Sequence, residues 1–280
     1  MVHLANAAGD KATISLYGGQ VLSWVAADGA ERLYCSPQAV HAEGRAVRGG
    51  IPVCFPQFAN RGKLPKHGFA RTSHWQLDGA TNTGCGKIVA SAELVLKDSE
   101  LSRAIWPHKF HLRLKASIGP GWLELKLQAL NCGPDAFSFT AALHTYLAVA
   151  NVQQAAVIGL ERVRYVDSMR SKAAHDDQPL KLQNDVKLQI TGEVDRIYTS
   201  APAAVRLASV TGPVLDVVQT GFADTVVWNP GPMKAAMLGD MPATDWDQML
   251  CIEAAQVMQP VLLQPSCSWA GSQQLTVCCR

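Results

Sequence analysis

Alternation of apolar and polar side chains dominates this sequence. In residues 110–118, FHLRLKASI, an apolar residue stands at every second position, with His, Arg, Lys and Ser between them. Residues 122–130, WLELKLQAL, repeat the pattern, and the GPG sequence at 119–121 is typical of a turn. A period of two indicates a strand with one buried and one solvated face. These segments are therefore predicted to form an antiparallel hairpin.

Similar short runs recur along the chain, separated by Gly, Pro, Asn and Asp. They lie at residues 12–24, 87–96, 138–149, 186–190, 204–209, 214–220, 224–229, 249–257 and 275–279. Many short strands rich in β-branched and aromatic residues favour a sandwich or barrel over βαβ units. Residues 159–176 have the propensity for a helix, which strand pairing in the folded protein can override. Because no repeat or break in composition divides the chain, we expect one all-β domain over residues 1–280.

Positive charge is concentrated in one stretch. The chain has 25 Lys and Arg against 23 Asp and Glu, and residues 48–72 hold five of these bases and no acid. Without these five, 20 bases remain against 23 acids, a net charge of −3. A protein that coats nucleic acid normally spreads its basic residues over a whole face. The pattern therefore argues against a nucleic-acid partner and indicates one small anionic ligand.

Other features of the sequence indicate where the protein is located and whether it needs a metal or disulfide bonds. Residues 1–19 lack the basic start and apolar run of a signal peptide, and no apolar segment reaches the roughly 20 residues that span a bilayer. We expect a cytoplasmic protein without a membrane partner; no pattern predicts its oligomeric state. The eight cysteines form no CxxC pair and no zinc-finger spacing, so we expect no disulfide framework and no metal, with most thiols buried.

The basic stretch, RGGIPVCFPQFANRGKLPKHGFART, has a composition suited to an ordered loop. Its glycines allow tight turns or a close approach to a ligand, and its three prolines restrict the path of the backbone. The guanidinium groups of Arg48 and Arg71 have the planar fork that binds a phosphate or carboxylate through two hydrogen bonds. The alternative is a solvated basic loop without a ligand.

Two ionisable residues stand inside strand-like segments. His144, in FTAALHTYLAV, falls on the less apolar face of its predicted strand, where it is either a functional group or an ordinary half-exposed histidine. Glu253, in MLCIEAAQV, is surrounded by apolar residues and requires a partner or a solvated pocket. An ion pair across the sheet and a catalytic carboxylate both satisfy that requirement.

Six segments carry a resemblance to a known family. They are, in order, RGGIPVCFPQF, LPKHGFART, ALHTYL, VDRIY, VVWNP and CIEAAQV. Their order and spacing resemble those of the hexose-6-phosphate mutarotases (glucose-6-phosphate 1-epimerases), a branch of the aldose 1-epimerase superfamily. The resemblance runs from about residue 12 to the end of the chain. It implies a large antiparallel β-sandwich of the galactose-mutarotase type, with a sugar cleft on one sheet face.

The resemblance also implies the roles of individual residues. The His of ALHTYL is the family's general acid and the Glu of CIEAAQV its general base, here His144 and Glu253. The positions of His67 and Asp195 bind the sugar ring and its hydroxyl groups. Deprotonation of the C1 hydroxyl with protonation of the ring oxygen opens the ring, and reclosure gives the other anomer. At its ordinary pKa Glu is ready as the base, and His can donate a proton if its environment keeps a useful fraction of it charged; the reaction needs no metal or redox cofactor.

The substrate implied by the resemblance is a sugar phosphate, because the positions of Arg48 and Arg71 take its phosphate. Relatives often have an aromatic residue where this chain has Gln57, and another after WNP where it has Gly231, so we expect both positions to alter the edge of the cleft, with Gln57 among the substrate-binding residues. Two alternatives remain at this point. One is a non-catalytic carbohydrate-binding or regulatory module, and the other a mutarotase for unphosphorylated aldoses.

Overall fold

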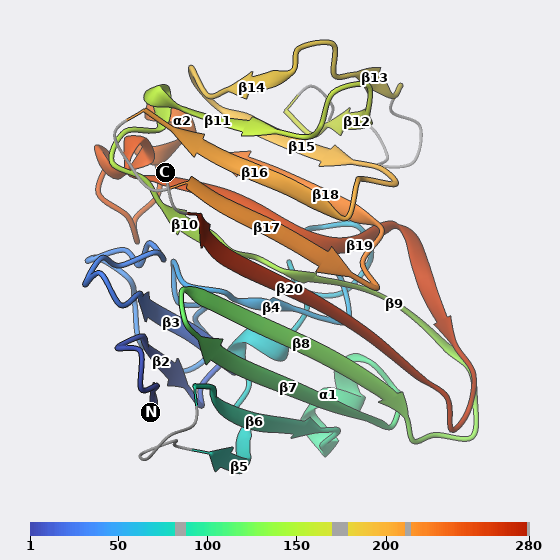
Figure 1. The fold of residues 1–280 in the computed structure, drawn as a ribbon. Coiled ribbons are helices and arrows are strands. Elements are labelled where there is room, and N and C mark those ends of the chain that lie inside the picture. Colours follow the sequence, from blue (N-terminus) through green and yellow to red (C-terminus); the bar gives the residue numbers. More distant parts are fainter. Residues whose placement is uncertain (82–87, 170–178, 211–213, 279–280) are drawn as a thin grey trace.

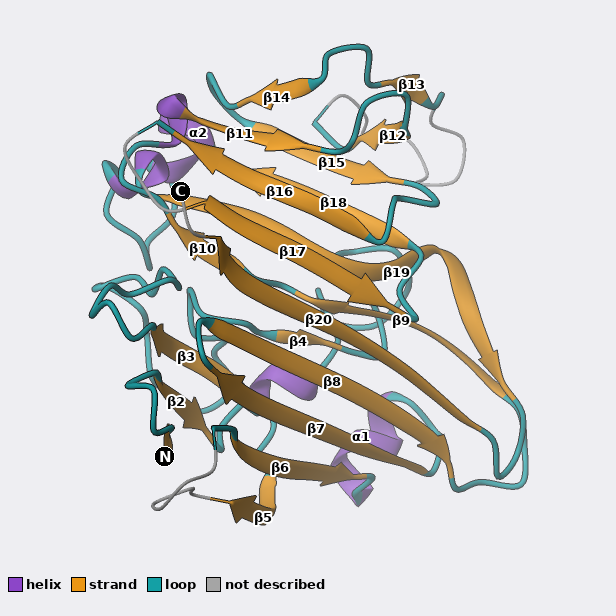
Figure 2. Cartoon of the chain, viewed as in Figure 1, coloured by secondary structure: helices purple, strands orange, loops and turns teal. Residues whose placement is uncertain are grey.

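Two large antiparallel sheets, stacked face to face, account for most of the chain (Figures 1 and 2). The computed structural model describes residues 1–81, 88–169, 179–210 and 214–278. Within these ranges every pairing between strands is antiparallel. The predicted fold class, an antiparallel β-sandwich, is confirmed.

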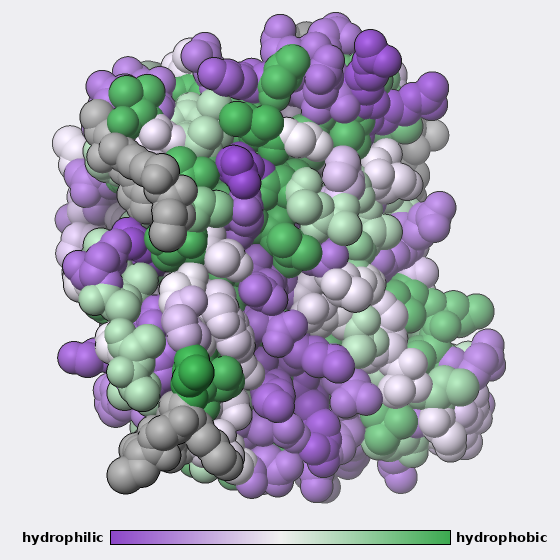
Figure 3. Space-filling model, viewed as in Figure 1, coloured by the Kyte–Doolittle hydropathy of each residue, from purple (hydrophilic) through white to green (hydrophobic). Residues whose placement is uncertain are grey.

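The first large sheet has nine strands in the order β14-β11-β16-β17-β20-β8-β7-β6-β5. The bounds are β5 (Gln76–Thr81), β6 (Ala90–Lys97), β7 (Phe110–Gly119), β8 (Trp122–Asn131), β11 (Ala155–Ile158), β14 (Lys187–Gln189), β16 (Ala204–Ser209), β17 (Val214–Thr220) and β20 (Ser268–Cys278). The predicted hairpin is β7 and β8, which pair from Phe110 with Asn131 to Gly119 with Trp122. Figure 3 shows this side of the molecule, with hydrophilic side chains gathered over β7 and β8.

The second large sheet has eight strands and carries the residues discussed below. Its order is β13-β12-β15-β18-β19-β9-β4, and β10 also pairs with β19. The bounds are β4 (Val53–Cys54), β9 (Phe137–Leu143), β10 (Tyr146–Ala148), β12 (Arg164–Asp167), β13 (Lys181–Leu182), β15 (Val194–Tyr198), β18 (Asp224–Asn229) and β19 (Met249–Leu263). Strand β19 is thus the common partner of β18, β9 and β10.

Smaller elements close the edges of the sandwich. A three-stranded sheet has the order β1-β2-β3, and the described helices are all short. Their bounds are β1 (Val2–Ala5), β2 (Lys11–Ser15), β3 (Gln20–Val25), α1 (Glu100–Ile105), α2 (Gly231–Ala235), and the 3₁₀ helices η1 (Ala70–Thr72), η2 (Val152–Gln154) and η3 (Asp245–Asp247). Among the described residues, no helix has the length and apolar character needed to cross a membrane.

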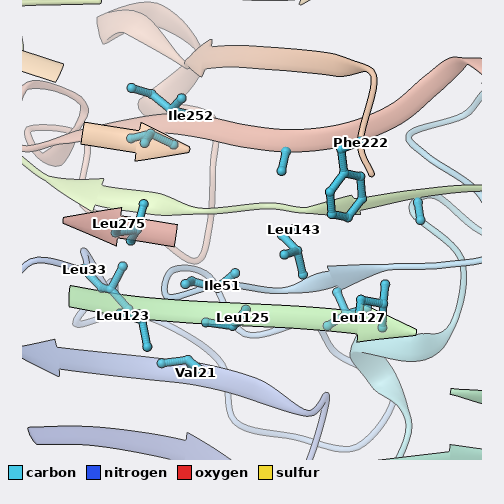
Figure 4. Close-up of a cluster of buried hydrophobic side chains, with 14 of the residues drawn as sticks. Val21, Leu33, Ile51, Leu123, Leu125, Leu127, Leu143, Phe222, Ile252 and Leu275 are labelled. Carbon is cyan, nitrogen blue, oxygen red and sulfur yellow. The ribbon is translucent and has the colours of Figure 1, made fainter. Parts of the chain in front are cut away.

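The main hydrophobic core lies between the two large sheets (Figure 4). Leu143 and Ile252 of the eight-stranded sheet and Leu125 and Leu275 of the nine-stranded sheet are each at most 1% exposed and belong to one cluster. Because side chains alternate along a strand, the neighbours of Leu143 and Ile252 point to the opposite face. That outer face of the eight-stranded sheet is where His144 and Glu253 lie.

One expectation from the sequence is wrong, and one propensity is overridden. Residues 164–167, inside the segment with helical propensity at 159–176, form strand β12, which pairs with β15 and has Tyr165 and Val166 buried. Residues 170–178 lie outside the described ranges. Most thiols were expected to be buried, yet of the six described cysteines only Cys54 and Cys251 are.

Candidate active site

Strand register brings His144 and Glu253 together. Leu143 of β9 pairs with Ala254 of β19, and Tyr146 of β10 pairs with Cys251. Both pairs have the same register, so His144, in the gap between β9 and β10, stands directly opposite Glu253. Its Nε2 lies 3.4 Å from Oε1 of Glu253. Directly opposed residues of an antiparallel pair point to the same face of the sheet, so the two groups form a cross-strand pair.

Both members of this pair are almost fully buried. His144 is 7% exposed and Glu253 1%. Burial lowers the pKa of His144 to about 3, assisted by the positive charges of Arg71 and Arg48. Burial, with the nearby charge of Asp195, raises the pKa of Glu253 well above its usual range. The free site therefore favours two uncharged groups, which corrects the expectation of a ready carboxylate and shows that the environment does not keep His144 charged.

A cavity of about 410 Å³ opens over the pair. Six basic side chains line it, together with the acids Asp195, Asp240 and Glu253. The basic residues are Arg45, Arg48, Arg61, Lys66, Arg71 and Lys234. Four of the five bases of residues 48–72 are thus brought to one cavity, and Lys63 is the exception. An excess of positive charge in a partly enclosed site favours an anionic ligand.

Arg48 is already engaged by an acidic side chain. Its Nε and Nη2 donate to the two carboxylate oxygens of Asp240, each at 3.1 Å, and its Nη1 donates to the Tyr146 hydroxyl at 3.3 Å. The arrangement is the two-point contact that a guanidinium group makes with a carboxylate or a phosphate. Asp240 therefore occupies the Nε and Nη2 donors of Arg48, which an anionic ligand would otherwise accept from.

Arg71 has fewer hydrogen-bond partners than Arg48. Its Nη2 donates to the backbone oxygen of Lys66 at 2.9 Å, whereas its Nε is buried and has no hydrogen-bond partner within the described residues. A buried donor without a partner is costly unless a ligand or water accepts from it. Arg71 is therefore better placed than Arg48 to receive an anion without first losing a protein contact.

His67 has an unusual backbone conformation and a fixed tautomer. Its φ of 64° lies in the left-handed region, which non-glycine residues seldom adopt and which recurs at functional sites. The backbone N–H of Ala59 donates to its Nδ1 at 3.3 Å, and burial lowers its pKa well below the usual range. The ring is therefore neutral with its hydrogen on Nε2. Since His67 lines the cavity next to His144, with ring centroids 5.3 Å apart, it can donate to a ligand there.

Asp195 comes from the neighbouring strand pair. It lies on β15 opposite Trp228 of β18, which is itself opposite Cys251 of β19, so all three share the face of Glu253. Asp195 lines the cavity, and burial raises the pKa of its carboxyl group. The carboxyl oxygens can accept hydrogen bonds from the hydroxyl groups of a ligand.

The structure places Gln57 and Gly231 away from the cavity lining. The Gln57 side chain donates to the backbone oxygens of Ala59 and Leu64, at 3.1 and 3.0 Å, and accepts from the Leu64 N–H at 3.0 Å. Gly231 has a φ of 60°, and a Cβ there would lie 2.4 Å from the backbone nitrogen of Glu193. Gln57 therefore stabilises the loop and Gly231 fits a tight turn; the expectation that Gln57 binds the substrate stays a prediction, and its hydrogen bonds in this structure are to the loop backbone.

This combination of fold and site has counterparts among known proteins. The aldose 1-epimerase family model matches residues 1–276. The chain belongs to the aldose 1-epimerase family. The resemblance seen in the six sequence segments is thereby confirmed, and the family makes this protein an isomerase.

Individual members of the aldose 1-epimerase family are similar to this chain over most of their length. A protein of Cenchrus ciliaris named "Putative glucose-6-phosphate 1-epimerase" is 37% identical over 269 residues, 93% of this chain and 79% of the relative. One of the same name from Salmonella typhimurium is 32% identical over 253 residues, 89% and 81% of the two chains. The crystal structure of a "putative mutarotase" from Salmonella typhimurium has a TM-score of 0.87 at 29% identity, covering 97% of this chain and 88% of that one.

Several cavity residues could not be assigned from sequence in this aldose 1-epimerase. Asp240 and Lys234 lie far along the chain from the basic stretch, and Lys234 donates to Glu193 at 2.7 Å. Tyr146 stacks on His144 with ring centroids 4.9 Å apart, and Trp228 meets His144 edge-on at 6.1 Å. Tyr146 lies in the segment ALHTYL and Trp228 in VVWNP, and this membership is the signal that could have placed both residues at the site.

Fold also creates a cluster that sequence spacing does not reveal. Donor atoms of His144, Cys251 and Glu253 all lie within 4.8 Å of one another, and all three residues are buried. The expectation of no metal rested on spacing along the chain, which cannot reveal donors that the fold brings together; it stays a prediction. The cluster coincides with the cross-strand pair.

Proposed function

We propose that this chain is a hexose-6-phosphate 1-epimerase that interconverts the α and β anomers of its substrate. One observation carries the proposal: the His144–Glu253 pair and six basic side chains line the same cavity. The pair offers the acid and base that ring opening requires, and the basic side chains provide a charge complement for a phosphate group. The names of the relatives from Cenchrus ciliaris and Salmonella typhimurium agree with this substrate class.

The reaction requires two proton transfers. In the proposed mechanism Glu253 accepts the proton of the C1 hydroxyl group while His144 donates a proton to the ring oxygen. The C1–O bond of the ring then breaks, the aldehyde rotates about the C1–C2 bond, and reclosure on its other face gives the second anomer. The reverse transfers return both groups to their starting protonation states, so neither a metal nor a redox cofactor is needed.

The charged states that this mechanism uses can form within the pair. The free site favours an uncharged pair, with one proton on Glu253 and a neutral His144 ring. Moving that proton to His144 gives the carboxylate and imidazolium without any exchange with solvent. Arg71 lowers the pKa of both groups, so a phosphate dianion that offsets its charge raises the pKa of both.

The remaining cavity groups position the sugar in this proposal. His67 donates through Nε2–H to a ring or hydroxyl oxygen, and Asp195 accepts from hydroxyl groups. Arg71 and Lys66 contact the phosphate, and Arg48 contributes after sharing or releasing Asp240. We also propose that the chain forms a single domain, because one hydrophobic cluster extends from Leu4 to Leu275. The cytoplasmic location stays a prediction.

Each alternative lacks an observation in its favour. A non-catalytic module has no need for an acid and a base in direct contact beneath the ligand cavity. A mutarotase for neutral sugars gives Arg71 and Lys66 no charged group to bind.

Anomer exchange followed by NMR or polarimetry tests the proposal, with α-glucose 6-phosphate, galactose 6-phosphate and free glucose as substrates and the spontaneous rate subtracted. We expect catalysis of the phosphorylated sugars and much slower turnover of free glucose. Equal turnover of glucose and glucose 6-phosphate would support the neutral-sugar alternative, and binding without turnover would support the module.

A further inference from the structure

Three buried side chains of the eight-stranded sheet form a compact set of metal donors. Cys251 and Glu253 are two residues apart on β19, so they point to the same face, and His144 is opposite Glu253. One ligand atom from each lies within 4.8 Å of the other two. Cys251 is 0% exposed and packs with Tyr146 and Met249 beneath the cavity.

The spacing of these donors fits a tetrahedral metal centre. Metal–nitrogen and metal–oxygen bonds of about 2.0–2.2 Å place two neighbouring ligands about 3.4 Å apart in a tetrahedron. Nε2 of His144 and Oε1 of Glu253 are 3.4 Å apart. The donor atom of Cys251 lies within 4.8 Å of a donor atom of each of the other two residues, so it is the candidate third ligand. His144 and Glu253 line the cavity, from which a water molecule can supply a fourth.

The same groups have hydrogen-bonding capacity that the described residues leave unused. Nδ1 of His144 and Oε2 of Glu253 are both buried without a hydrogen-bond partner in the described part of the chain. Buried polar atoms without partners are uncommon, and each one calls for a ligand, a water or an ion. Oε2 shares the Glu253 carboxylate with Oε1 and can join it on one metal, whereas Nδ1 is on the far side of the His144 ring from Nε2 and takes no part in the proposed site.

We propose that His144, Cys251 and Glu253 bind a thiophilic divalent cation, such as Zn²⁺ or Cd²⁺, and that the bound cation blocks the active site. Binding converts the Cys251 thiol to a thiolate and releases its proton to solvent, together with any proton held by Glu253. The metal occupies both the acid and the base, so a hexose 6-phosphate and the metal compete. The binding itself is independent of the proposed function; only the inhibition rests on it.

The electrostatics of the cavity restrict which cations bind. Six basic side chains line it, and burial raises the pKa of Cys251 well above the usual range. A cation must therefore gain enough from the metal–thiolate bond to overcome both costs. Soft or borderline cations do so, whereas Mg²⁺ and Ca²⁺ prefer oxygen ligands and gain nothing from sulfur.

Direct binding provides the first test. The intact wild-type chain is titrated with Cd²⁺, and the ultraviolet absorption of the cadmium–thiolate bond is recorded for wild type, Cys251→Ser and Cys54→Ser. Cys54 is the matched control because it is equally buried and lies outside the donor set. We expect Cys251→Ser to lose one equivalent of bound Cd²⁺ that Cys54→Ser keeps. Equal cadmium absorption in wild type and Cys251→Ser, with both folded by circular dichroism, would overturn the proposal.

Inhibition provides the second test and separates the two proposals. Zn²⁺ should inhibit anomer exchange by the wild type, EDTA should restore it, and Cys251→Ser should resist inhibition by at least about tenfold in Zn²⁺ concentration. Resistance equal to that of the wild type would overturn the assignment of Cys251 as a ligand. Specific cadmium binding by a protein without epimerase activity would support the metal site and count against the proposed function.

Discussion

His144 and Glu253 occupy directly opposed positions on neighbouring strands of the eight-stranded sheet, with Nε2 and Oε1 3.4 Å apart. The strand is interrupted at residues 144 and 145, between β9 and β10, and the register with β19 is the same on both sides of the interruption. The backbone N–H of His144 donates instead to the Pro52 oxygen at 2.9 Å. The basic stretch and the proposed acid are therefore held together by the backbone.

Removing either member of this pair should abolish most of the turnover. We expect Glu253→Gln and His144→Ala each to lower kcat for glucose 6-phosphate by about 10² or more, the usual effect of losing a positioned acid or base. Glu124→Gln on β8, in the other sheet, is the control and should retain activity. Near-wild-type turnover by either site variant in an NMR exchange assay would remove that residue from the mechanism.

The same glutamate should make the wild type less stable at neutral pH than Glu253→Gln. Because burial raises the folded-state pKa of Glu253, its stability contribution is fully present below about pH 4.5 and is lost as pH rises toward the folded pKa. In that window the wild type loses up to about 1.4 kcal/mol per pH unit relative to the glutamine variant. His144 is present in both proteins, so its own titration largely cancels in the difference.

Thermal unfolding of both proteins from pH 4 to pH 8 measures this difference. The melting temperature of Glu253→Gln should equal that of the wild type near pH 4 and exceed it increasingly at higher pH. A variant that is less stable than the wild type at pH 8 would mean that Glu253 is ionised and paired with a charged His144.

The sequence predicted strands well because their burial pattern is local. The hairpin of β7 and β8 follows from alternation alone, since its apolar positions include Leu112, Leu114, Leu123 and Leu125, all at most 1% exposed. Residues 164–167 show the limit of local reasoning. Their helical propensity is outweighed by pairing with β13 and β15, which lie outside the segment with that propensity.

The candidate site could be predicted only in part, because sequence motifs identify its residues but not the contacts between them. Recognised segments contain His144, Glu253, His67 and Asp195, and the fold brings all four to one cavity. Local sequence patterns cannot predict contacts between segments that are distant along the chain. The contact between Asp240 and Arg48 is an example, because it forms only when the loop after α2 folds onto the basic stretch. Sequence also could not give the pKa directions of the pair, since these depend on burial.

Lys63 and Lys66 test whether the basic stretch acts through the cavity or through its overall charge. Lys66 lines the cavity and Lys63 does not, although only two residues separate them. We expect Lys66→Ala to raise KM for glucose 6-phosphate by less than about tenfold, with an effect that shrinks as salt is raised, and Lys63→Ala to leave KM unchanged. Equal effects of the two substitutions at low salt would point to general attraction rather than contact.

Gln57 should matter for stability rather than for substrate choice. Its side chain makes three hydrogen bonds to the backbone at Ala59 and Leu64, and Gln57→Met keeps the volume but leaves these groups without partners. We expect a loss of roughly 1–3 kcal/mol in the free energy of unfolding, measured by denaturant titration. KM should change by the same factor for glucose and glucose 6-phosphate. A selective change for one sugar would place Gln57 among the substrate-binding residues.

Arg48, Asp240 and Arg71 give the sharpest test of the phosphate site. Arg71 has a buried Nε without a described partner, whereas two donors of Arg48 are bound to Asp240. Arg71→Ala should therefore raise KM for glucose 6-phosphate by about one to two decades, since a charge-assisted hydrogen bond contributes about 1.5–3 kcal/mol. KM for free glucose should not change.

In the proposed site, Arg48→Ala removes a phosphate contact and also leaves the Asp240 carboxylate without its Arg48 partner, in the cavity proposed to bind the phosphate. Its effect on KM should therefore combine a lost attraction with a new repulsion. Asp240→Asn in the Arg48→Ala background removes only the repulsion, so the double variant should bind glucose 6-phosphate more tightly than Arg48→Ala alone. The measurement is KM for both sugars in the two single variants and the double variant. If the double variant binds glucose 6-phosphate no better than Arg48→Ala, Asp240 does not face the phosphate, and the ion pair serves to hold the loop after α2 in place.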